Sequence, residues 1–248
     1  MYVQIKVLVS LFVVLSLLYM VYSTSIRSPI PPIYSVGSTG LDMSWPEGNC
    51  NAPAKLLKTW AIIGTNDGLD FRGNPCLKAE ASRFKNISLY ANTGISSSAN
   101  RHVYAEYPKK CTKKDNNCLA YNYGYNAGKY AVIYSSSMGI HASFWWLDVE
   151  TDNSWSTNIS YNRSSIQGEV DAIKDYTLVA KVGIYSYPGQ WDTITGNWRT
   201  GMPDWVATGT SDRRTAISFC NGKSFTGGPT LLTQYTLTLD HDFVCRDF

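Results

Sequence analysis

The chain has 248 residues, a length typical of one α/β barrel or of two smaller domains. It carries 22 Lys and Arg against 19 Asp and Glu, a formal net charge of +3, and 44% of its residues are hydrophobic, so a large core can form. The weak charge argues against nucleic acid as a partner, because the one short basic run, Lys109–Asp115 (KKCTKKD), is typical of a solvated loop.

The first residues, 1–23, have the composition of a secretory signal peptide. Lys6 is the only charged residue before Arg27, and the stretch VLVSLFVVLSLLYMVYS after it is apolar to small. Val21 and Ser23 stand where a signal peptidase inspects the chain, so we predict cleavage after Ser23. An uncleaved anchor is the alternative, since roughly 17 apolar residues reach the lower limit for spanning a bilayer.

Residues 24–35 include the proline-rich stretch SIRSPIPPIYS and are expected to form an extended lead-in to one domain over residues 36–248. Short apolar runs recur along this domain, each followed by polar or glycine-rich residues, as in buried parallel strands. The predicted strands are 40–44, 61–66, 87–92, 143–150, 181–186, 204–209 and 231–236, with a short eighth one at 239–245.

Segments with helical character lie between several of these strands, at residues 53–60, 76–84, 123–136 and 164–176. Residues 190–203, QWDTITGNWRTGMP, contain two glycines and a proline and are expected to make a poor helix. Alternation of strand and helix predicts a parallel sheet with crossover helices, and at this length a closed barrel is the economical arrangement. We therefore expect a single irregular (β/α) barrel of the TIM type, with weak or missing helices in its C-terminal third.

The strand SFWWLDVE carries the most informative acids. Side chains alternate along a strand, so Phe144, Trp146, Asp148 and Glu150 share one face. The two acids are about 7 Å apart along the backbone and come at the carboxyl end of their strand, where barrel enzymes hold their catalytic groups. Two carboxyl groups in unlike surroundings can divide the work of glycoside hydrolysis, one ionised and one protonated. A structural role as a helix cap or solvated strand end is the alternative.

Further acids end the first and last predicted strands. Asp42 lies in GLDMSW, and Asp240 and Asp242 lie in LDHDF. Because the first and last strands are neighbours in a closed barrel, we expect Asp42 and one of the C-terminal pair at the same rim as Asp148 and Glu150.

The supply of aromatic residues also suits a sugar site. Eight Trp and 17 Tyr exceed the needs of a core of this size, and flat rings with a polar edge pack well on pyranose faces. The candidate substrate-binding residues in or just after the predicted strands are Trp45, Tyr90, Tyr185, Trp205 and Gln234.

Six cysteines agree with export to an oxidising compartment, where an even number can pair completely. Fifteen pairings exist in principle, and sequence order favours three local bridges: Cys50 to Cys76, Cys111 to Cys118, and Cys220 to Cys245. Three N-x-S sequons, at Asn86, Asn158 and Asn162, are candidates for glycosylation and predict surface loops.

With these residues assembled, the chain resembles the glycoside hydrolase family 25 lysozymes, and more closely a secreted, cysteine-containing branch of family-25-like proteins common in actinobacteria. The likeness covers most of the region from Gly40 to Cys245. The matching motifs are Asp42-Met43-Ser44, Asp148-Val149-Glu150, Gly183 to Ser186, Trp205 to Ala207 and Thr233-Gln234-Tyr235.

The resemblance implies an irregular α/β barrel that cleaves the β-1,4 bond between N-acetylmuramic acid and N-acetylglucosamine in peptidoglycan. By motif, Glu150 would be the general acid, and Asp148 would orient the acetamido group of the substrate for a substrate-assisted step. Asp42 and Asp242 would be supporting acids, Asp242 being preferred over Asp240 because an aromatic residue follows it. The sequence departs from the family in two places: no histidine follows Tyr90, and Thr233 replaces the Trp of W-Q-Y.

Two functions from different classes remain at this point. The first is a secreted, monomeric glycan hydrolase of lysozyme type, acting without a cofactor or metal. The second is a non-catalytic carbohydrate-binding or cell-surface protein on the same barrel, to which the two departures point. A serine or metal hydrolase has no support, because the sequence holds no G-x-S-x-G and no H-E-x-x-H, and His102, His141 and His241 are scattered.

Overall fold

The structure is a computed structural model that describes residues 34–44, 50, 60–96, 102–177 and 180–248. The predicted signal peptide and nearly all of the lead-in lie outside the described residues. So do Trp45 and residues 53–59 of the first predicted helix.

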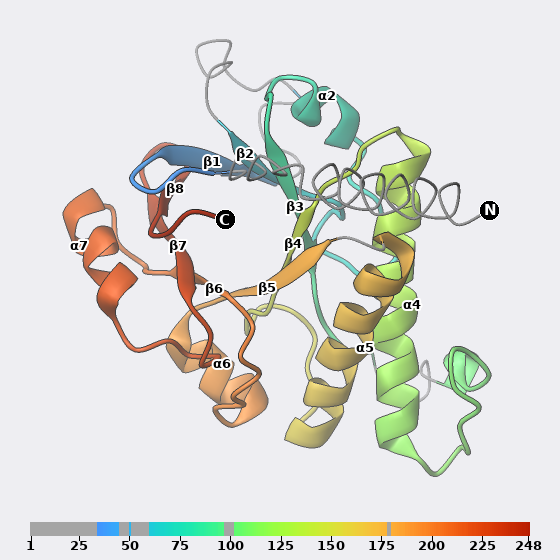
Figure 1. Cartoon of the computed structure of the whole chain (residues 1–248). Coiled ribbons are helices and arrows are strands. Elements are labelled where there is room, and N and C mark those ends of the chain that lie inside the picture. The colour runs from blue at the N-terminus through green and yellow to red at the C-terminus, as the bar shows by residue number, and fades with distance from the viewer. Residues whose placement is uncertain (1–33, 45–49, 51–59, 97–101, 178–179) are drawn as a thin grey trace, which may run out of the picture. The chain divides into compact units, whose positions relative to one another are not determined.

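The described strands close into a barrel in chain order, from β1 to β8 (Figure 1). Their bounds are β1 Thr39–Met43, β2 Ala61–Gly64, β3 Ile87–Asn92, β4 Phe144–Asp148, β5 Lys181–Ser186, β6 Asp204–Ala207, β7 Thr230–Thr236 and β8 Asp240–Val244. Every strand expected from the sequence is present, and the barrel fold is confirmed.

The last strand runs against the rest of the barrel. Neighbouring strands from β1 to β7 pair in parallel, whereas β8 is antiparallel to both β7 and β1. Only residues 237–239 connect β7 to β8, closed by a bond from the Leu237 N–H to the Leu239 carbonyl. A connection this short makes a hairpin and cannot carry a crossover helix, so the expectation of parallel pairing is wrong for this strand.

The helices lie outside the barrel. They are α2 Leu77–Ala81, α4 Asn116–Ser137, α5 Ile159–Thr177, α6 Pro188–Thr195 and α7 Arg213–Ser218, with 3₁₀ turns η3 His102–Tyr104 and η4 Phe219–Asn221. The two long ones, α4 and α5, lie side by side along one flank (Figure 1). Those that follow β5 are short, as expected for the C-terminal third.

The predicted poor helix over residues 190–203 is helical only in its first part. Pro188 stands at the start of α6, where a missing N–H costs nothing, and Gly196 ends it in the left-handed conformation (φ +61°). The glycine and proline residues that follow keep residues 196–203 out of any helix.

Alternation along β4 separates two cores, as the sequence predicted. Trp145 and Leu147 pack in the cluster that includes Ile166 of α5, between sheet and helices. Phe144 and Trp146 pack in the other cluster, which fills the barrel interior with strand side chains. Asp148 continues this inward-facing row, so β4 delivers its carboxyl group into the open end of the barrel.

The end of the barrel interior away from Asp148 is closed by aromatic residues from the first and last parts of the domain. The ring of Tyr34 stacks on Trp60 at 4.0 Å and meets Phe248 edge-on at 5.0 Å. Phe248 also lies 5.0 Å from Phe144, at the start of β4. Two backbone hydrogen bonds join Tyr34 and Phe248 to each other.

Helices α4 and α5 touch backbone to backbone at two glycines. A Cβ on Gly124 would lie 1.9 Å from the carbonyl oxygen of Ser165, and a Cβ on Gly168 would lie 2.1 Å from that of Tyr121. Only glycine fits at either position, so these residues fix how closely the two helices approach.

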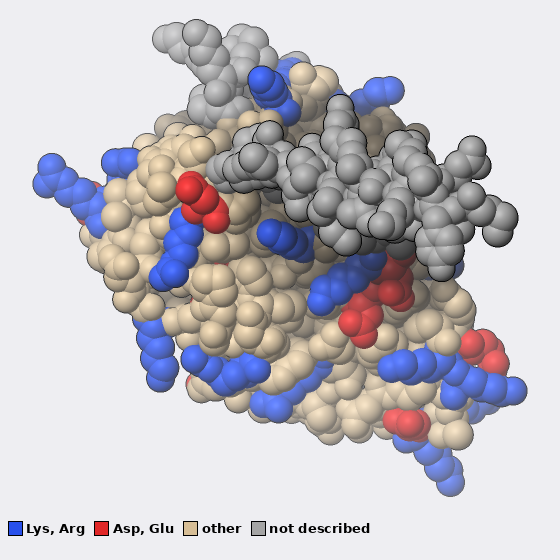
Figure 2. Space-filling model, viewed as in Figure 1, with Lys and Arg blue, Asp and Glu red and all other residues tan. Residues whose placement is uncertain are grey.

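All six cysteines are paired, in the pattern that sequence order favoured: Cys50–Cys76, Cys111–Cys118 and Cys220–Cys245. Figure 2 shows Lys and Arg side chains at many places on the visible face, with fewer Asp and Glu side chains among them. Of the helices that the structure describes, none is both long and apolar enough to cross a bilayer.

Candidate active site

Carboxyl groups from three strands meet at the open end of the barrel. Asp42 lies near the end of β1, Asp148 ends β4, Glu150 follows two residues later, and Asp240 begins β8. All four line one cavity of about 230 Å³. The lining is Asp42, Ser44, Tyr90, Asn92, Asp148, Glu150, Tyr185, Trp205, Gln234 and Asp240.

Asp148 is the buried member of the central pair, with 6% of its surface exposed. The side-chain amide of Asn92, at the end of β3, donates to Asp148 Oδ2 at 2.6 Å. Burial raises the pKa of Asp148 well above its usual value, and the nearby carboxyl groups of Glu150 and Asp42 raise it further.

Glu150 is partly exposed and stands beyond the end of β4. Its carbonyl accepts a hydrogen bond from Trp155 Nε1 at 2.7 Å, which fixes the backbone at this point. Burial raises the pKa of the Glu150 carboxyl, Asp152 and Asp240 raise it further, and a hydrogen bond with Asp148 lowers it. The net direction is upward, so Glu150 keeps its proton to a higher pH than an ordinary glutamate does.

The two C-terminal acids sit at different depths because β8 runs antiparallel. Asp240 begins that strand beside Thr236 at the rim, whereas Asp242 pairs with Gly40 and Gln234 below it. Asp242 is fully buried and accepts a hydrogen bond from Trp205 Nε1 at 2.7 Å. Burial and the carboxyl group of Asp42 raise its pKa. Asp242 therefore supports the cavity from beneath, and Asp240 lines it.

A hydrogen-bonded chain connects Asp42 to the opposite wall of the cavity. Gln234 Nε2 donates to Asp42 Oδ2 at 2.9 Å, and the Tyr185 hydroxyl donates to Gln234 Oε1 at 2.8 Å. Gln234 uses both ends of its amide in this chain, so it orients Asp42 and Tyr185 relative to each other.

Of the predicted aromatic residues, Tyr90, Tyr185 and Trp205 line the cavity, and Trp45 lies outside the described residues. The rings of Tyr185 and Trp205 are 4.3 Å apart. Trp205 is only 2% exposed, so it serves the core as much as the cavity.

Sequence reasoning missed Asn92 and Ser44. Asn92 is also held by Asn66, whose Oδ1 accepts from the Asn92 backbone N–H at 2.9 Å and whose Nδ2 donates to the Asn92 carbonyl at 3.2 Å. The available signal was its position, since Asn92 ends a buried strand at the same rim as the acids.

The described lining contains no Lys or Arg, so nothing in it neutralises the carboxyl groups by charge. Within the described residues, no group of three or more His, Cys, Asp or Glu side chains is arranged to hold a metal ion. The carboxylates therefore repel one another, and this repulsion favours their protonated forms.

One predicted glycosylation position does not fit the structure. Asn86 and Asn158 are exposed, but Asn162 is 1% exposed. Its amide bonds the backbone of Ser156 and the carbonyl of Ile194, so a sugar at Asn162 is incompatible with this fold.

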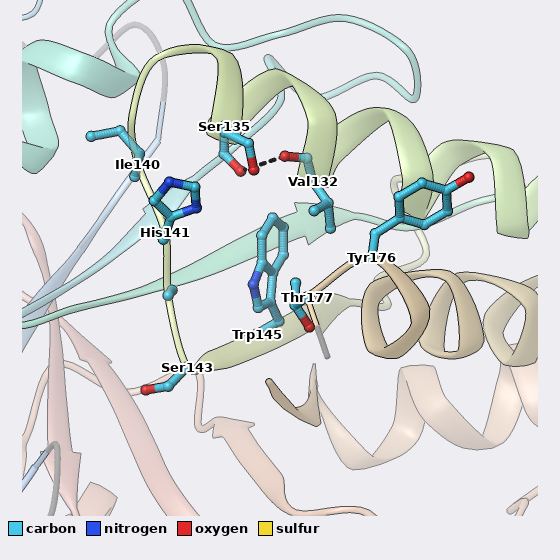
Figure 3. Close-up of a pocket in the computed structure, with 10 residues that line it drawn as sticks. Val132, Ser135, Ile140, His141, Ser143, Trp145, Tyr176 and Thr177 are labelled. Atoms are coloured by element: carbon cyan, nitrogen blue, oxygen red, sulfur yellow. Dashed lines mark hydrogen bonds between the residues drawn. The ribbon is translucent and has the colours of Figure 1, made fainter. Parts of the chain in front are cut away.

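A cavity of about 380 Å³ lies at the opposite end of β4 (Figure 3). It is bounded by the end of α4, the start of β4 and the end of α5, with His141 and Trp145 among its lining residues. Its described lining holds no carboxyl side chain, so this larger cavity lacks the acid pair found at the open end.

Comparisons with known proteins agree with the family suggested by the motifs. The sequence pattern of a family described as lysozyme-like protein 1 matches residues 76–227, which is more than half of the chain. A protein named probable GH family 25 lysozyme 5, from Dictyostelium discoideum, is 39% identical over 67 residues. That match covers 26% of this chain and 31% of the relative, so the chain spans about a third of the relative's length.

Two solved structures are similar at low identity. A muramidase from Trichobolus zukalii has a TM-score of 0.49 and 15% identity, over 83% of this chain and 92% of that one. A GH53 catalytic domain from Ignisphaera aggregans has a TM-score of 0.43 and 14% identity, over 79% of this chain and 68% of that one.

Proposed function

Because the chain belongs to the lysozyme-like protein 1 family, we propose that it is a secreted glycoside hydrolase that cleaves β-1,4 bonds in a peptidoglycan-like glycan. The family membership agrees with the resemblance of the chain to the family 25 lysozymes. The observation that carries the proposal is the pair of Asp148 and Glu150, one buried and one at the cavity wall, with both pKa values raised. Three disulfides are compatible with an oxidising, extracellular location.

Glu150 is the general acid in this proposal. Its raised pKa keeps a proton available, and its partial exposure lets the carboxyl group reach the glycosidic oxygen. The proton moves to that oxygen as the bond to the anomeric carbon breaks, so the leaving sugar departs as an alcohol.

Asp148 has the complementary role. In the free protein, burial and the neighbouring carboxyl groups favour the protonated form of Asp148. The amide of Asn92, which donates to Asp148 Oδ2, and the N–H of a bound acetamido group both favour the ionised carboxylate, so in the substrate complex we place the negative charge on Asp148 and the proton on Glu150. The Asp148 carboxylate orients the N–H of the substrate's acetamido group, whose oxygen forms a bond to the anomeric carbon. Water then attacks that carbon and opens the ring so formed, with Glu150 taking the water's proton. Asp42 and Asp240 line the cavity around the cleaved sugar, and Asp242 holds Trp205 in place beneath it.

The first experiment measures release of reducing ends and loss of turbidity when the purified protein meets a panel of bacterial peptidoglycans and chitin. Glu150→Gln keeps the shape and removes the proton donor, so we expect activity to fall by about 10²-fold or more. Glu106→Gln is the matched control, because Glu106 is exposed and lies outside the cavity.

Each outcome decides between the two functions. Activity that is lost in Glu150→Gln and kept in Glu106→Gln supports the hydrolase. Equal turnover in both variants contradicts the assignment of Glu150. Glycan binding without turnover in the unaltered protein supports the non-catalytic carbohydrate-binding alternative.

A further inference from the structure

A second cavity adjoins the candidate active site at the open end of the barrel. It encloses about 270 Å³ and shares Asn92 with the catalytic cavity. Its lining is Gly68, Leu69, Asp70, Arg72, Asn92, Gly94, Ser96, Tyr123, Asp152, Asn153 and Ser154. The two cavities therefore meet along the wall that Asn92 forms.

A folded loop after β2 presents Asp70 to this second cavity. Asn66 and Gly73 form a short bridge that closes the loop, and Phe71 adopts the left-handed conformation at φ +61°. A bulky side chain rarely takes that conformation, and here the ring of Phe71 is held against Tyr104 at 5.3 Å and Tyr123 at 5.4 Å. The packing of Phe71 fixes the direction of Asp70.

The side chain of Asp70 is partly buried against α4, and a tyrosine of that helix donates a hydrogen bond to it. The Tyr123 hydroxyl donates to Asp70 Oδ2 at 2.6 Å, and burial raises the pKa of Asp70 to about 6. No salt bridge to a Lys or Arg is formed by Asp70 within the described chain; Arg72, in the same lining, pairs instead with Asp67 at 2.8 Å. Asp70 is thus an acceptor without a cationic partner.

Apolar surface and amide groups complete the lining. Leu69 is 54% exposed at the tip of the loop, beside the acid. Asn92 and Asn153 bring amides from the side of the catalytic cavity, where Asn153 Nδ2 donates to the Asp148 carbonyl at 3.0 Å. An apolar side chain beside a few fixed polar groups is the combination that binds one face of a sugar ring together with its hydroxyl or amide groups.

We propose that this second cavity, centred on Asp70, is a subsite that binds the sugar unit next to the one held in the catalytic cavity. Asp70 accepts a hydrogen bond from a hydroxyl or acetamido N–H of that unit, and Leu69 packs on its apolar face. The inference rests on the proposed hydrolase function and adds to it that the preferred substrate is a chain of several amino-sugar units rather than a disaccharide.

The test measures kcat, KM and binding affinity for chitin oligosaccharides from dimer to hexamer. We expect the KM of the unaltered protein to fall once the oligomer is long enough to enter the second cavity. Asp70→Asn and Leu69→Ala should each remove about 10-fold of that gain, which corresponds to about 1.4 kcal/mol, and leave kcat and the KM of the shortest cleaved oligomer unchanged.

Asp171→Asn is the matched control. Asp171 also accepts a hydrogen bond from a tyrosine, Tyr121, at 2.8 Å, but it lies on α5 outside both cavities. Leu69→Ala decides the question if Asp70→Asn fails to fold, because Leu69 is an exposed loop residue.

The subsite and the hydrolase function fail in different ways. If the unaltered protein gains affinity with length and both variants keep that gain, the subsite is wrong and the hydrolase stands. If the unaltered protein cleaves nothing, the hydrolase is wrong. The affinities of the oligomers, measured by calorimetry, then still decide whether Asp70 and Leu69 bind sugar.

Discussion

The carboxyl group of Glu150 is surrounded by other acids, and this sets the pH range in which it holds a proton. Among charged neighbours, Asp152 contributes most to the raised pKa of Glu150. Removing that charge with Asp152→Asn should lower the pKa of Glu150. An acid that must be protonated to act then loses its proton at lower pH, so the alkaline limb of the kcat/KM profile should move to lower pH.

Asp192→Asn is the control for this shift, because Asp192 is exposed on α6 and does not line the cavity. A profile whose alkaline limb stays in place in Asp152→Asn, or moves equally in both variants, would show that Asp152 does not set the pKa of the working acid.

The amide of Asn92 lines the cavity and donates a hydrogen bond to Asp148 Oδ2 at 2.6 Å. Asn92→Ala leaves Asp148 Oδ2 without that donor, and an unsatisfied buried group costs about 1–3 kcal/mol. Because ionised Asp148 becomes less favourable, we expect kcat/KM to fall by about 10- to 100-fold in steady-state assays on the glycan. Asn126→Ala, which removes bonds to the Tyr107 and Asn122 carbonyls, should leave the rate unchanged. Equal rates in the two variants would contradict the role of Asn92.

At this scale the sequence predicted the positions of acids better than their partners. Alternation along β4 puts Asp148 beside the inward-facing Trp146, as a strand must. Asn92 could not be found that way, because its contact with Asp148 depends on the register of β3 against β4, and one residue of slip would turn Asn92 away.

At the scale of elements, the contact between α4 and α5 leaves the least room for a larger side chain. Alanine at Gly124 or Gly168 would drive a methyl group into a backbone carbonyl of the partner helix, which cannot move alone. Overpacking of this kind typically costs about 1–3 kcal/mol, so the melting temperature should fall by several degrees at about 2–4 °C per kcal/mol. Gly189→Ala is the control, since a Cβ there meets only the Tyr187 side chain at 3.3 Å. Equal melting temperatures in all three variants would show that the helices can separate without cost.

The sequence predicted the strand β8 but not its antiparallel direction. The run LDHDFVC correctly indicates a strand, but period-two alternation is the same in either direction. The deciding feature is the connection of residues 237–239, which is too short for a crossover. That reversal also decides the depth of Asp240 and Asp242, which the motif alone left ambiguous.

Taken as a whole, the molecule buries several carboxyl groups, and this gives its stability a particular pH dependence. Glu169 is 1% exposed, and burial, followed by the charge of Asp70, raises its pKa well above the ordinary value. The folded state then binds the proton more tightly than the unfolded state, so stability falls as pH rises above about 4.5, the ordinary pKa.

Glu169→Gln removes this penalty without emptying the site. The variant should melt more than about 2 °C above the unaltered protein at pH 8, and the difference should shrink toward zero near pH 4.5, where the glutamate is protonated in both states. Melting curves across this pH range check the sign, and a variant that is less stable at pH 8 would contradict it.

The barrel itself could be predicted from the sequence because its strands are short, buried and regularly followed by polar or glycine-rich turns. The bounds of the helices were harder to predict. α4 and α5 extend beyond their predicted bounds, and Tyr121, which lies outside the predicted part of α4, donates a hydrogen bond to Asp171 on the neighbouring helix. Such contacts depend on chain folding rather than on local preference.

The hydrogen-bonded pair of Tyr34 and Phe248 brings the first and last parts of the domain together at the end of the barrel opposite the carboxyl groups. A bead, fluorophore or fusion partner joined at that end would stand roughly 15 Å or more from the acids, the length of a five-residue strand. An immobilised preparation attached there would turn its open end toward an insoluble wall, whereas one attached through lysines at random would hide that end in a fraction of the molecules.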